Sequence, residues 1–132
     1  MRDHIMIVVA ENDDGTRTVL ASALARNGYD VASVTDGQLV LSTLASGEVG
    51  LLILDLRMPG MNGWEVLRRL KDPGDPGSPP TTRPPVIVIS AQSDPETQRF
   101  ATRLGAAAFL AKPIDLHDLS HTVRRVLSQT QP

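Results

Sequence analysis

Short apolar runs alternate with longer amphipathic segments along this chain. The runs contain few polar positions, which is typical of strands buried on both faces of a parallel sheet. The segments between them repeat apolar residues with the period of a helix. The pattern predicts an α/β fold, a doubly wound five-stranded parallel sheet with five helices and right-handed crossovers. The expected strands are 5–10, 31–34, 51–54, 86–90 and 107–111, and the expected helices are 15–26, 37–46, 64–71, 95–104 and 116–129.

Helix-capping residues support these boundaries. An aspartate precedes most of the expected helices, where its carboxylate can accept hydrogen bonds from the free N–H groups of the first turn. The last helix has an apolar stripe that we expect to face the core. The expected caps are Asp13 or Asp14, Asp36, Asp94 with Pro95 after it, and Asp115; Asn27-Gly28 ends the first helix; the stripe is Leu116, Leu119, Val123, Val126 and Leu127.

Length and composition indicate one domain, residues 1–132. Hydrophobic residues make up 41% and aromatic residues only 3%, so the core must be aliphatic. One segment, 73–85, interrupts the alternation and holds six of the ten prolines. It cannot form a helix or a central strand, and we interpret it as a surface insertion between the third helix and the fourth strand.

Several classes of function are disfavoured. The net charge is -2 with no basic run, so nothing indicates binding to nucleic acid or to a membrane surface. There is no cysteine for a disulfide or a thiolate zinc site. No apolar run approaches the ~18 residues of a membrane span, so a cytoplasmic protein is expected. His117 and His121 are one helical turn apart, but without a third ligand nearby we interpret them as solvent-exposed.

Candidate chemistry lies where the strands end. Glu11 and Asn12 follow the first strand, Asp55 the third, Ser90 ends the fourth and Lys112 follows the fifth. Ligands bind at the carboxyl ends of the strands in such sheets. Clustered carboxylates repel one another, so we expect this edge to need a hard cation, and Mg²⁺ prefers oxygen ligands. With Asp55 as nucleophile and the ammonium and hydroxyl on the remaining oxygens, the set favours phosphoryl chemistry.

Three stretches carry a family resemblance: LLILDLRMPGMNGWEVL (51–67), VIVISA (86–91) and AAFLAKPI (107–114), together with the acidic end of the first strand followed by Arg17. The Asp-x-x-Met-Pro-x-Met-x-Gly pattern at 55–63 is highly specific. Over almost its whole length the chain resembles the receiver domains of two-component response regulators, the CheY-like superfamily. The resemblance implies a flavodoxin-like sheet with strand order 2-1-3-4-5.

The resemblance also implies roles for individual residues. Asp55 is the expected phosphoacceptor, with Ser90 and Lys112 contacting the phosphoryl group. Glu11, Asn12, Asp55 and the backbone carbonyl of Arg57 are the expected Mg²⁺ ligands. The other implied roles are a switch aromatic at Phe109 acting with Ser90, a cis peptide before Pro113, and a loop shaped by Pro59 and by Gly63, which would adopt a backbone conformation that a larger residue resists.

One position departs from the family. Asn12 stands where the family has a carboxylate bound directly to Mg²⁺, and Asp13 is expected to cap the first helix rather than replace it. The loss of one negative charge beside a divalent ion in a wet cleft predicts that Mg²⁺ binding is a few kcal/mol weaker, about tenfold to a thousandfold in affinity.

These observations leave two main hypotheses. In the first, a histidine kinase or phosphotransfer protein phosphorylates Asp55, and the domain switches its 94–128 surface toward a downstream partner, a linked output domain or a homodimer. It is then not an enzyme but assists its own phosphorylation and dephosphorylation. The alternative is a degenerate module with an impaired Mg²⁺ site, acting as a phosphorylation-independent protein–protein interaction domain. A small α/β enzyme is a third possibility with no further catalytic set to support it. We expect either a stand-alone regulator or a domain of a larger protein.

Overall fold

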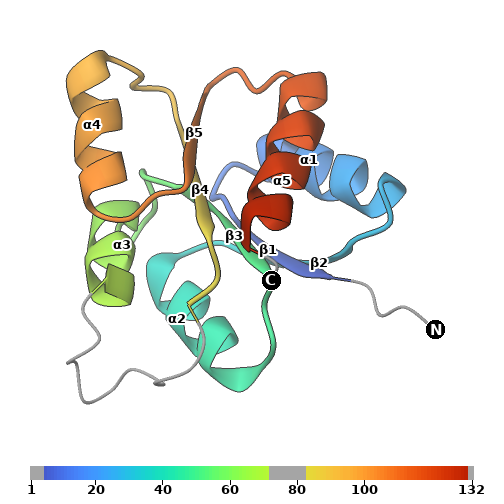
Figure 1. Cartoon of the computed structure of the whole chain (residues 1–132). Coiled ribbons are helices and arrows are strands. Elements are labelled where there is room, and N and C mark those ends of the chain that lie inside the picture. Colours follow the sequence, from blue (N-terminus) through green and yellow to red (C-terminus); the bar gives the residue numbers. More distant parts are fainter. Residues whose placement is uncertain (1–4, 72–82, 131–132) are drawn as a thin grey trace.

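A parallel five-stranded sheet forms the centre of the molecule (Figure 1). The computed structural model describes residues 5–71 and 83–130. The strand order is β2-β1-β3-β4-β5, with every neighbouring pair parallel, which confirms the predicted order. The strands are β1 (Met6–Ala10), β2 (Asp30–Val34), β3 (Leu51–Asp55), β4 (Val86–Ser90) and β5 (Ala108–Ala111).

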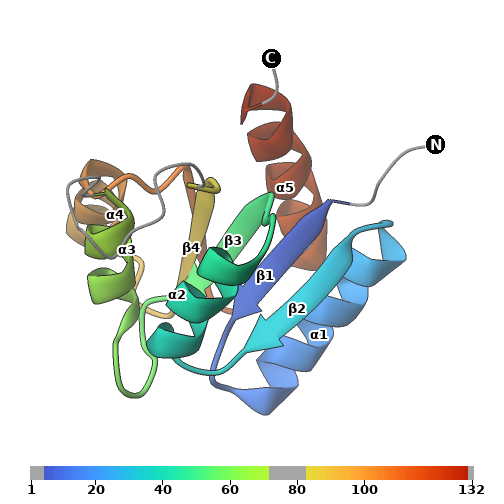
Figure 2. The ribbon, with the colours of Figure 1, turned by 90° about the horizontal axis from the view of Figure 1, so that it is seen from below.

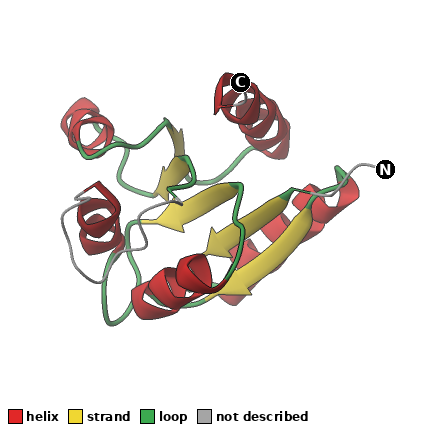
Figure 3. Ribbon diagram, turned by 60° about the horizontal axis from the view of Figure 1, so that its bottom comes forward, coloured by secondary structure: helices red, strands yellow, loops and turns green. Residues whose placement is uncertain are grey.

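Five helices connect and cover the strands, on both faces of the sheet (Figure 3). The helices α1 and α5 pack on one face, and α2, α3 and α4 pack on the other. This arrangement confirms the predicted doubly wound fold. The helices are α1 (Asp14–Arg26), α2 (Gly37–Ser46), α3 (Gly63–Lys71), α4 (Pro95–Arg103) and α5 (Leu116–Thr130).

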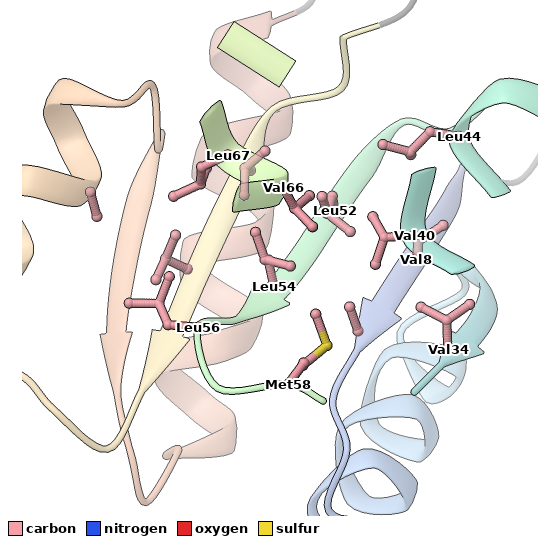
Figure 4. Close-up of a cluster of buried hydrophobic side chains, with 14 residues drawn as sticks. Val8, Val34, Val40, Leu44, Leu52, Leu54, Leu56, Met58, Val66 and Leu67 are labelled. Atoms are coloured by element: carbon pink, nitrogen blue, oxygen red, sulfur yellow. The ribbon is translucent and has the colours of Figure 1, made fainter. Parts of the chain in front are cut away.

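Side-chain alternation divides the core into two layers. In β1, Ile7 and Val9 face α1 and α5, whereas Val8 and Ala10 face the opposite layer. All four are fully buried, so this strand shows no polar alternation in the sequence. Figure 4 shows the second layer, where Met58, from the loop after β3, joins the strand and helix side chains.

The aspartate caps are present at four helices, and Asp13 rather than Asp14 caps the first. Asp13, Asp36 and Asp94 each accept a hydrogen bond from the backbone N–H three residues on, and Asp115 accepts from His117 and Asp118.

The exposure of Leu116 differs from the prediction, and the proline-rich segment is only partly described. Leu116 was predicted to face the core but is 41% exposed, because it lies in the first turn of α5, outside the stretch that covers the sheet. The other members of the predicted stripe are buried. Residues 72–82, which include most of the predicted insertion at 73–85, lie outside the described residues. Of its end, Pro84 is buried, and the Pro85 carbonyl accepts a hydrogen bond from the Leu52 N–H.

All strands point the same way, so their carboxyl ends share one edge of the sheet (Figure 2). The register places Asp55 beside Ile89 and Ser90 beside Ala111, one residue before Lys112. The β1–α1 loop begins at the same edge with Glu11, whose N–H donates to the Val34 carbonyl. The fold therefore gathers the predicted polar residues at one place.

Candidate functional site

Three charged side chains meet at the carboxyl edge of the sheet. The Nζ atom of Lys112 lies 2.7 Å from Oε1 of Glu11 and 2.9 Å from Oδ2 of Asp55. Glu11 and Asp55 are only 1% and 4% exposed, whereas the Lys112 side chain keeps 22% of its surface in solvent. One partly exposed ammonium thus bridges two buried carboxylates from strands that are neighbours in the sheet.

Backbone N–H groups hold the second oxygen of each carboxylate. The N–H of Asp13 donates to Oε2 of Glu11 at 2.9 Å, and the N–H of Arg57 donates to Oδ1 of Asp55 at 3.1 Å. Both donors lie two residues after their acceptor, in the loop that follows the strand. The loops after β1 and β3 therefore fix the orientation of the two carboxylates before any ligand is present.

Burial and charge act on these groups in opposite directions. Burial raises the pKa of Glu11 above its ordinary value, the neighbouring Asp55 carboxylate adds to the rise, and the Lys112 ammonium only partly offsets it. Burial acts to lower the pKa of Lys112, but hydrogen bonding and charge from Glu11 and Asp55 outweigh it and raise that pKa. Oε1 of Glu11 is buried and lies in ionic contact with the Lys112 ammonium at 2.7 Å.

This geometry corrects one expectation from the sequence. The clustered carboxylates were expected to need a hard cation, but the Lys112 ammonium already neutralises one of the two negative charges. Lys112 begins the β5–α5 connection, and its peptide bond to Pro113 is cis, as predicted. The site therefore keeps a net charge of about -1.

Ser90 lies at the same edge. Its side chain is buried, its Oγ accepts a hydrogen bond from the Gln92 N–H at 2.9 Å, and its carbonyl accepts one from the Lys112 N–H at 2.8 Å. The residue is thus tied to the lysine through the backbone. Phe109, in β5, is partly buried against the layer that contains α2, α3 and α4.

Asn12 is exposed, unlike the buried Glu11 and Asp55. Its neighbour Asp13 uses its carboxylate to accept from the N–H and the hydroxyl of Thr16, both at 2.8 Å. These bonds lower the pKa of Asp13. Asp13 is therefore occupied as the cap of α1, as predicted.

Arg17 braces the loop after β1, a contact that the sequence indicated only by the place of this arginine after the acidic end of the first strand. Its guanidinium donates to the Glu11 carbonyl at 2.9 Å and to the Asn12 carbonyl at 3.4 Å. It also pairs with Asp14 at 2.5 Å. The bracing explains why an arginine one turn into α1 accompanies the acidic residues at the end of β1.

Gly63 is needed for a different reason from the one predicted. The glycines with positive φ among the described residues are Gly28, Gly60 and Gly105, so Gly63 does not require a left-handed conformation. A Cβ atom on Gly63 would instead lie 2.5 Å from the Asp55 carbonyl oxygen and 2.7 Å from the Cα of Leu56. Helix α3 thus begins directly against the backbone of the strand end, which only glycine permits.

The oxygen donors at this edge are of the kind that Mg²⁺ prefers. Two carboxylates, the Asn12 amide and the Arg57 carbonyl are oxygen donors, and Mg²⁺ often binds through one or two carboxylates and keeps several waters. The net negative charge of the three side chains favours a further cation. Within 5–71 and 83–130, no three His, Cys, Asp or Glu side chains group closely enough to hold a metal by themselves. His117 and His121 are exposed.

Comparison with known proteins identifies the family. The family model of the response regulator receiver domain matches residues 7–124. The chain belongs to this family, the receiver domains of two-component signalling systems. Phosphorylation and Mg²⁺ binding are general features of the family. The relatives give no support to the alternative of a degenerate module.

The curated relatives are longer than this chain. It is 35% identical over 125 residues to the sensory/regulatory protein RpfC of Xanthomonas campestris, which is 95% of this chain and 17% of that protein. It is 36% identical over 125 residues to the DNA-binding transcriptional regulator NtrC of Rhizobium meliloti, 93% of this chain and 24% of that protein. It is 32% identical over 128 residues to the response regulator MprA of Mycobacterium bovis, which is 97% of this chain and 53% of that protein. The chain spans about half or less of these proteins.

Solved structures share the fold. The receiver domain of Francisella response regulator 1452 superposes with a TM-score of 0.86 at 23% identity, covering 97% of this chain and 100% of that one. The signal receiver domain of a histidine kinase from Syntrophus aciditrophicus superposes with a TM-score of 0.81 at 29% identity, covering 96% of this chain and 92% of that one.

No helix among the described residues is long and apolar enough to cross a bilayer.

Proposed function

We propose that Asp55 is the phosphoacceptor of this receiver domain and that a histidine kinase or phosphotransfer protein is the donor. The observation that carries the proposal is the environment of the Asp55 carboxylate. It is buried at the carboxyl edge of the sheet, 2.9 Å from the Lys112 ammonium and fixed by the Arg57 N–H. An oriented carboxylate beside a fixed cation is suited to attack a phosphoryl group and to stabilise its charge.

The proposed transfer involves one bond formed and one broken. A carboxylate oxygen of Asp55 forms the new O–P bond while the bond from phosphorus to the donor histidine nitrogen breaks, and that nitrogen keeps the electron pair. Lys112 then moves its ammonium from the carboxylate toward a phosphoryl oxygen, and the Ser90 hydroxyl contacts another. The same residues assist the later hydrolysis, so the domain promotes its own phosphorylation and dephosphorylation without acting on a separate substrate.

Glu11 and Asp55, with the Arg57 carbonyl and the Asn12 amide, would hold Mg²⁺. Bound there, the ion would neutralise charge on the phosphoryl oxygens. Glu11 contributes a buried oxygen, Oε1, which lies 2.7 Å from the Lys112 ammonium. Because Asn12 brings no charge and its side chain is exposed, a higher Mg²⁺ requirement than with a carboxylate at this position is part of the proposal.

An apolar groove beside the site suits the donor. It has a volume of about 680 Å³, and it extends from Lys112 along the start of α1 and the β5–α5 connection. Val19 and Leu116, which line it, are 50% and 41% exposed. A helix of the donor protein lying in this groove would bring its histidine toward Asp55 from the exposed side of Lys112. This accounts for apolar side chains left outside the core.

The 94–128 surface is the proposed output surface, switched through Ser90 and Phe109. Within it, Phe100 is 47% exposed and its ring lies 5.0 Å from that of Trp64 in α3. A downstream partner, a linked output domain or a second copy of the domain would bind here after phosphorylation. A cytoplasmic location belongs to the same proposal.

Intact mass measurement tests the proposal. The protein is incubated with acetyl phosphate and increasing Mg²⁺, with Asp55→Asn as the matched control. We expect a single phosphoryl adduct that requires both Asp55 and Mg²⁺. No adduct on the folded protein at any Mg²⁺ concentration would refute it and would favour the degenerate, phosphorylation-independent module instead.

A further inference from the structure

Gly37, the first residue of α2, lies against the loop that follows Asp55. A Cβ atom at Gly37 would be 2.0 Å from the carbonyl oxygen of Met61, 2.8 Å from its carbonyl carbon and 2.9 Å from its Cβ. Contacts below 3.0 Å are essentially never made by a real Cβ. Gly37 is buried and has a negative φ. The glycine is therefore required by close approach of two backbones and not by its own conformation.

The loop in question, residues 56–62, is held at both ends. At one end the Gly63 N–H donates to the Leu56 carbonyl at 3.1 Å, and a Cβ on Gly63 would strike the Asp55 carbonyl at 2.5 Å. Near the middle, Met58 is buried in the core cluster (Figure 4). At the far end Met61 rests on Gly37. The loop is thus held at three points. At one of them, Met61, the contact comes from α2, a helix that has no side chain in the charged cluster.

We propose that Gly37 is a positioning residue for the phosphorylation site: its contact with Met61 holds the 56–62 loop so that the Arg57 peptide stays beside Asp55. The Arg57 N–H then orients the Asp55 carboxylate, as the 3.1 Å hydrogen bond shows. This inference rests on the proposed function only in taking Asp55 as the phosphoacceptor. Helix α2 has no side chain in the charged cluster, and it acts through the loop alone.

The size of the effect follows from the distances. A methyl group at Gly37 would lie 2.0 Å from the Met61 carbonyl oxygen, and this distance must increase to at least 3.0 Å, so either the loop or the start of α2 moves by about 1 Å. A displacement of this size at a reacting group can cost about 10²-fold in rate. Part of the movement will be taken up by α2, so at least a tenfold loss is expected.

Two alanine substitutions in the same helix region provide the test. Gly37→Ala introduces the contact with Met61, whereas Gly47→Ala, at the other end of α2, meets nothing within 4 Å. For each variant we would measure amide hydrogen exchange by NMR, and the initial rate of phosphoryl adduct formation from acetyl phosphate with Mg²⁺. The exchange of the Arg57 and Gly63 amides reports directly on the loop and requires neither metal nor phosphate.

Gly37→Ala should accelerate exchange at Arg57 and Gly63 about tenfold relative to strand amides such as Val8, and slow adduct formation at least tenfold. Gly47→Ala should change neither. Equal acceleration of all amides in Gly37→Ala, or unchanged loop exchange, would overturn the positioning role. If the wild-type protein forms no adduct, the proposed function fails, and the exchange data still decide the role of Gly37.

If Gly37→Ala does not fold, the double variant Gly37→Ala/Met61→Gly replaces it. Removing the Met61 side chain eliminates the 2.9 Å contact and lets that peptide turn away from the methyl group. We expect this protein to fold, with fast exchange at Arg57 and slow phosphorylation. Folding with wild-type exchange and rate would contradict the inference.

Discussion

Replacing Lys112 by methionine removes the only cation in contact with the two buried carboxylates among the described residues. Methionine keeps a flexible side chain of similar length, so the main loss is the charge. Glu11 and Asp55 would then face one another without a counterion. We expect the free energy of unfolding to fall, because uncompensated buried charges are costly.

The magnitude follows from the geometry. At separations of 2.7 and 2.9 Å, each ion pair is worth roughly 6 kcal/mol of Coulomb attraction at an effective dielectric constant of about 20. The cost of burying the charges offsets much of this attraction. Removing one partner of a buried pair costs about 3–5 kcal/mol. Because Lys112 is 22% exposed and Glu11 can take up a proton, we expect a loss of about 2–3 kcal/mol.

The loss should depend on pH. Burial raises the pKa of Glu11 in the folded protein, and without Lys112 that pKa rises further. A carboxyl group with a raised pKa binds its proton more readily in the folded state, so its contribution to stability is lost as the pH rises through the folded pKa. The destabilisation by Lys112→Met should therefore be larger near pH 8 than near pH 5.

Urea unfolding with and without Mg²⁺ measures both effects. Lys71→Met is the matched control, since Lys71 is the only other lysine in the chain and its ammonium donates to the exposed Arg103 carbonyl. Added Mg²⁺ should restore more stability to Lys112→Met than to the wild type, because the two carboxylates are free to bind it. Equal stability of the two methionine variants, or no extra stabilisation by Mg²⁺, would refute the reasoning.

Further substitutions give simpler outcomes. Asn12→Asp should tighten Mg²⁺ binding about tenfold or more, measured by titration with Trp64 fluorescence as the signal. An unchanged affinity would contradict our assignment of this position. Gly63→Ala, whose Cβ would lie 2.5 Å from the Asp55 carbonyl, should cost about 1–3 kcal/mol in urea unfolding. Asp94→Ala should lower the melting temperature at neutral pH. Hydrogen bonds from Thr97 lower the pKa of Asp94, so its stabilisation is lost as the pH falls through that value, and the effect of the substitution should shrink near pH 3.

Much of the fold could be predicted because local signals agreed with one another. Buried strands without polar alternation, helical periods and aspartate caps all indicated the same βα repeat, and α2 and β4 have the predicted bounds. The edge of the sheet where the polar residues gather followed from the rule for parallel strands. The sequence pattern therefore located Glu11, Asp55 and Lys112 together before any distance was known.

What the sequence could not reveal depends on distances between segments. No periodicity shows that Lys112 lies between both carboxylates, or that Gly37 touches Met61 across the loop. Gly63 was predicted to be needed for its backbone conformation, but the steric reason became visible only with Asp55 placed against it. Leu116 fits the apolar stripe of α5 by spacing, yet its place in the first turn leaves it exposed.

The identity of the acceptor residue tests the central claim most directly. The protein would be treated with acetyl phosphate and Mg²⁺, reduced with borohydride, which converts an aspartyl phosphate to homoserine, and digested for peptide mass analysis. We predict homoserine at position 55 and at no other aspartate, and none in the Asp55→Asn control. Homoserine at another position, or none in a sample that carries the phosphoryl adduct, would contradict the account of this site.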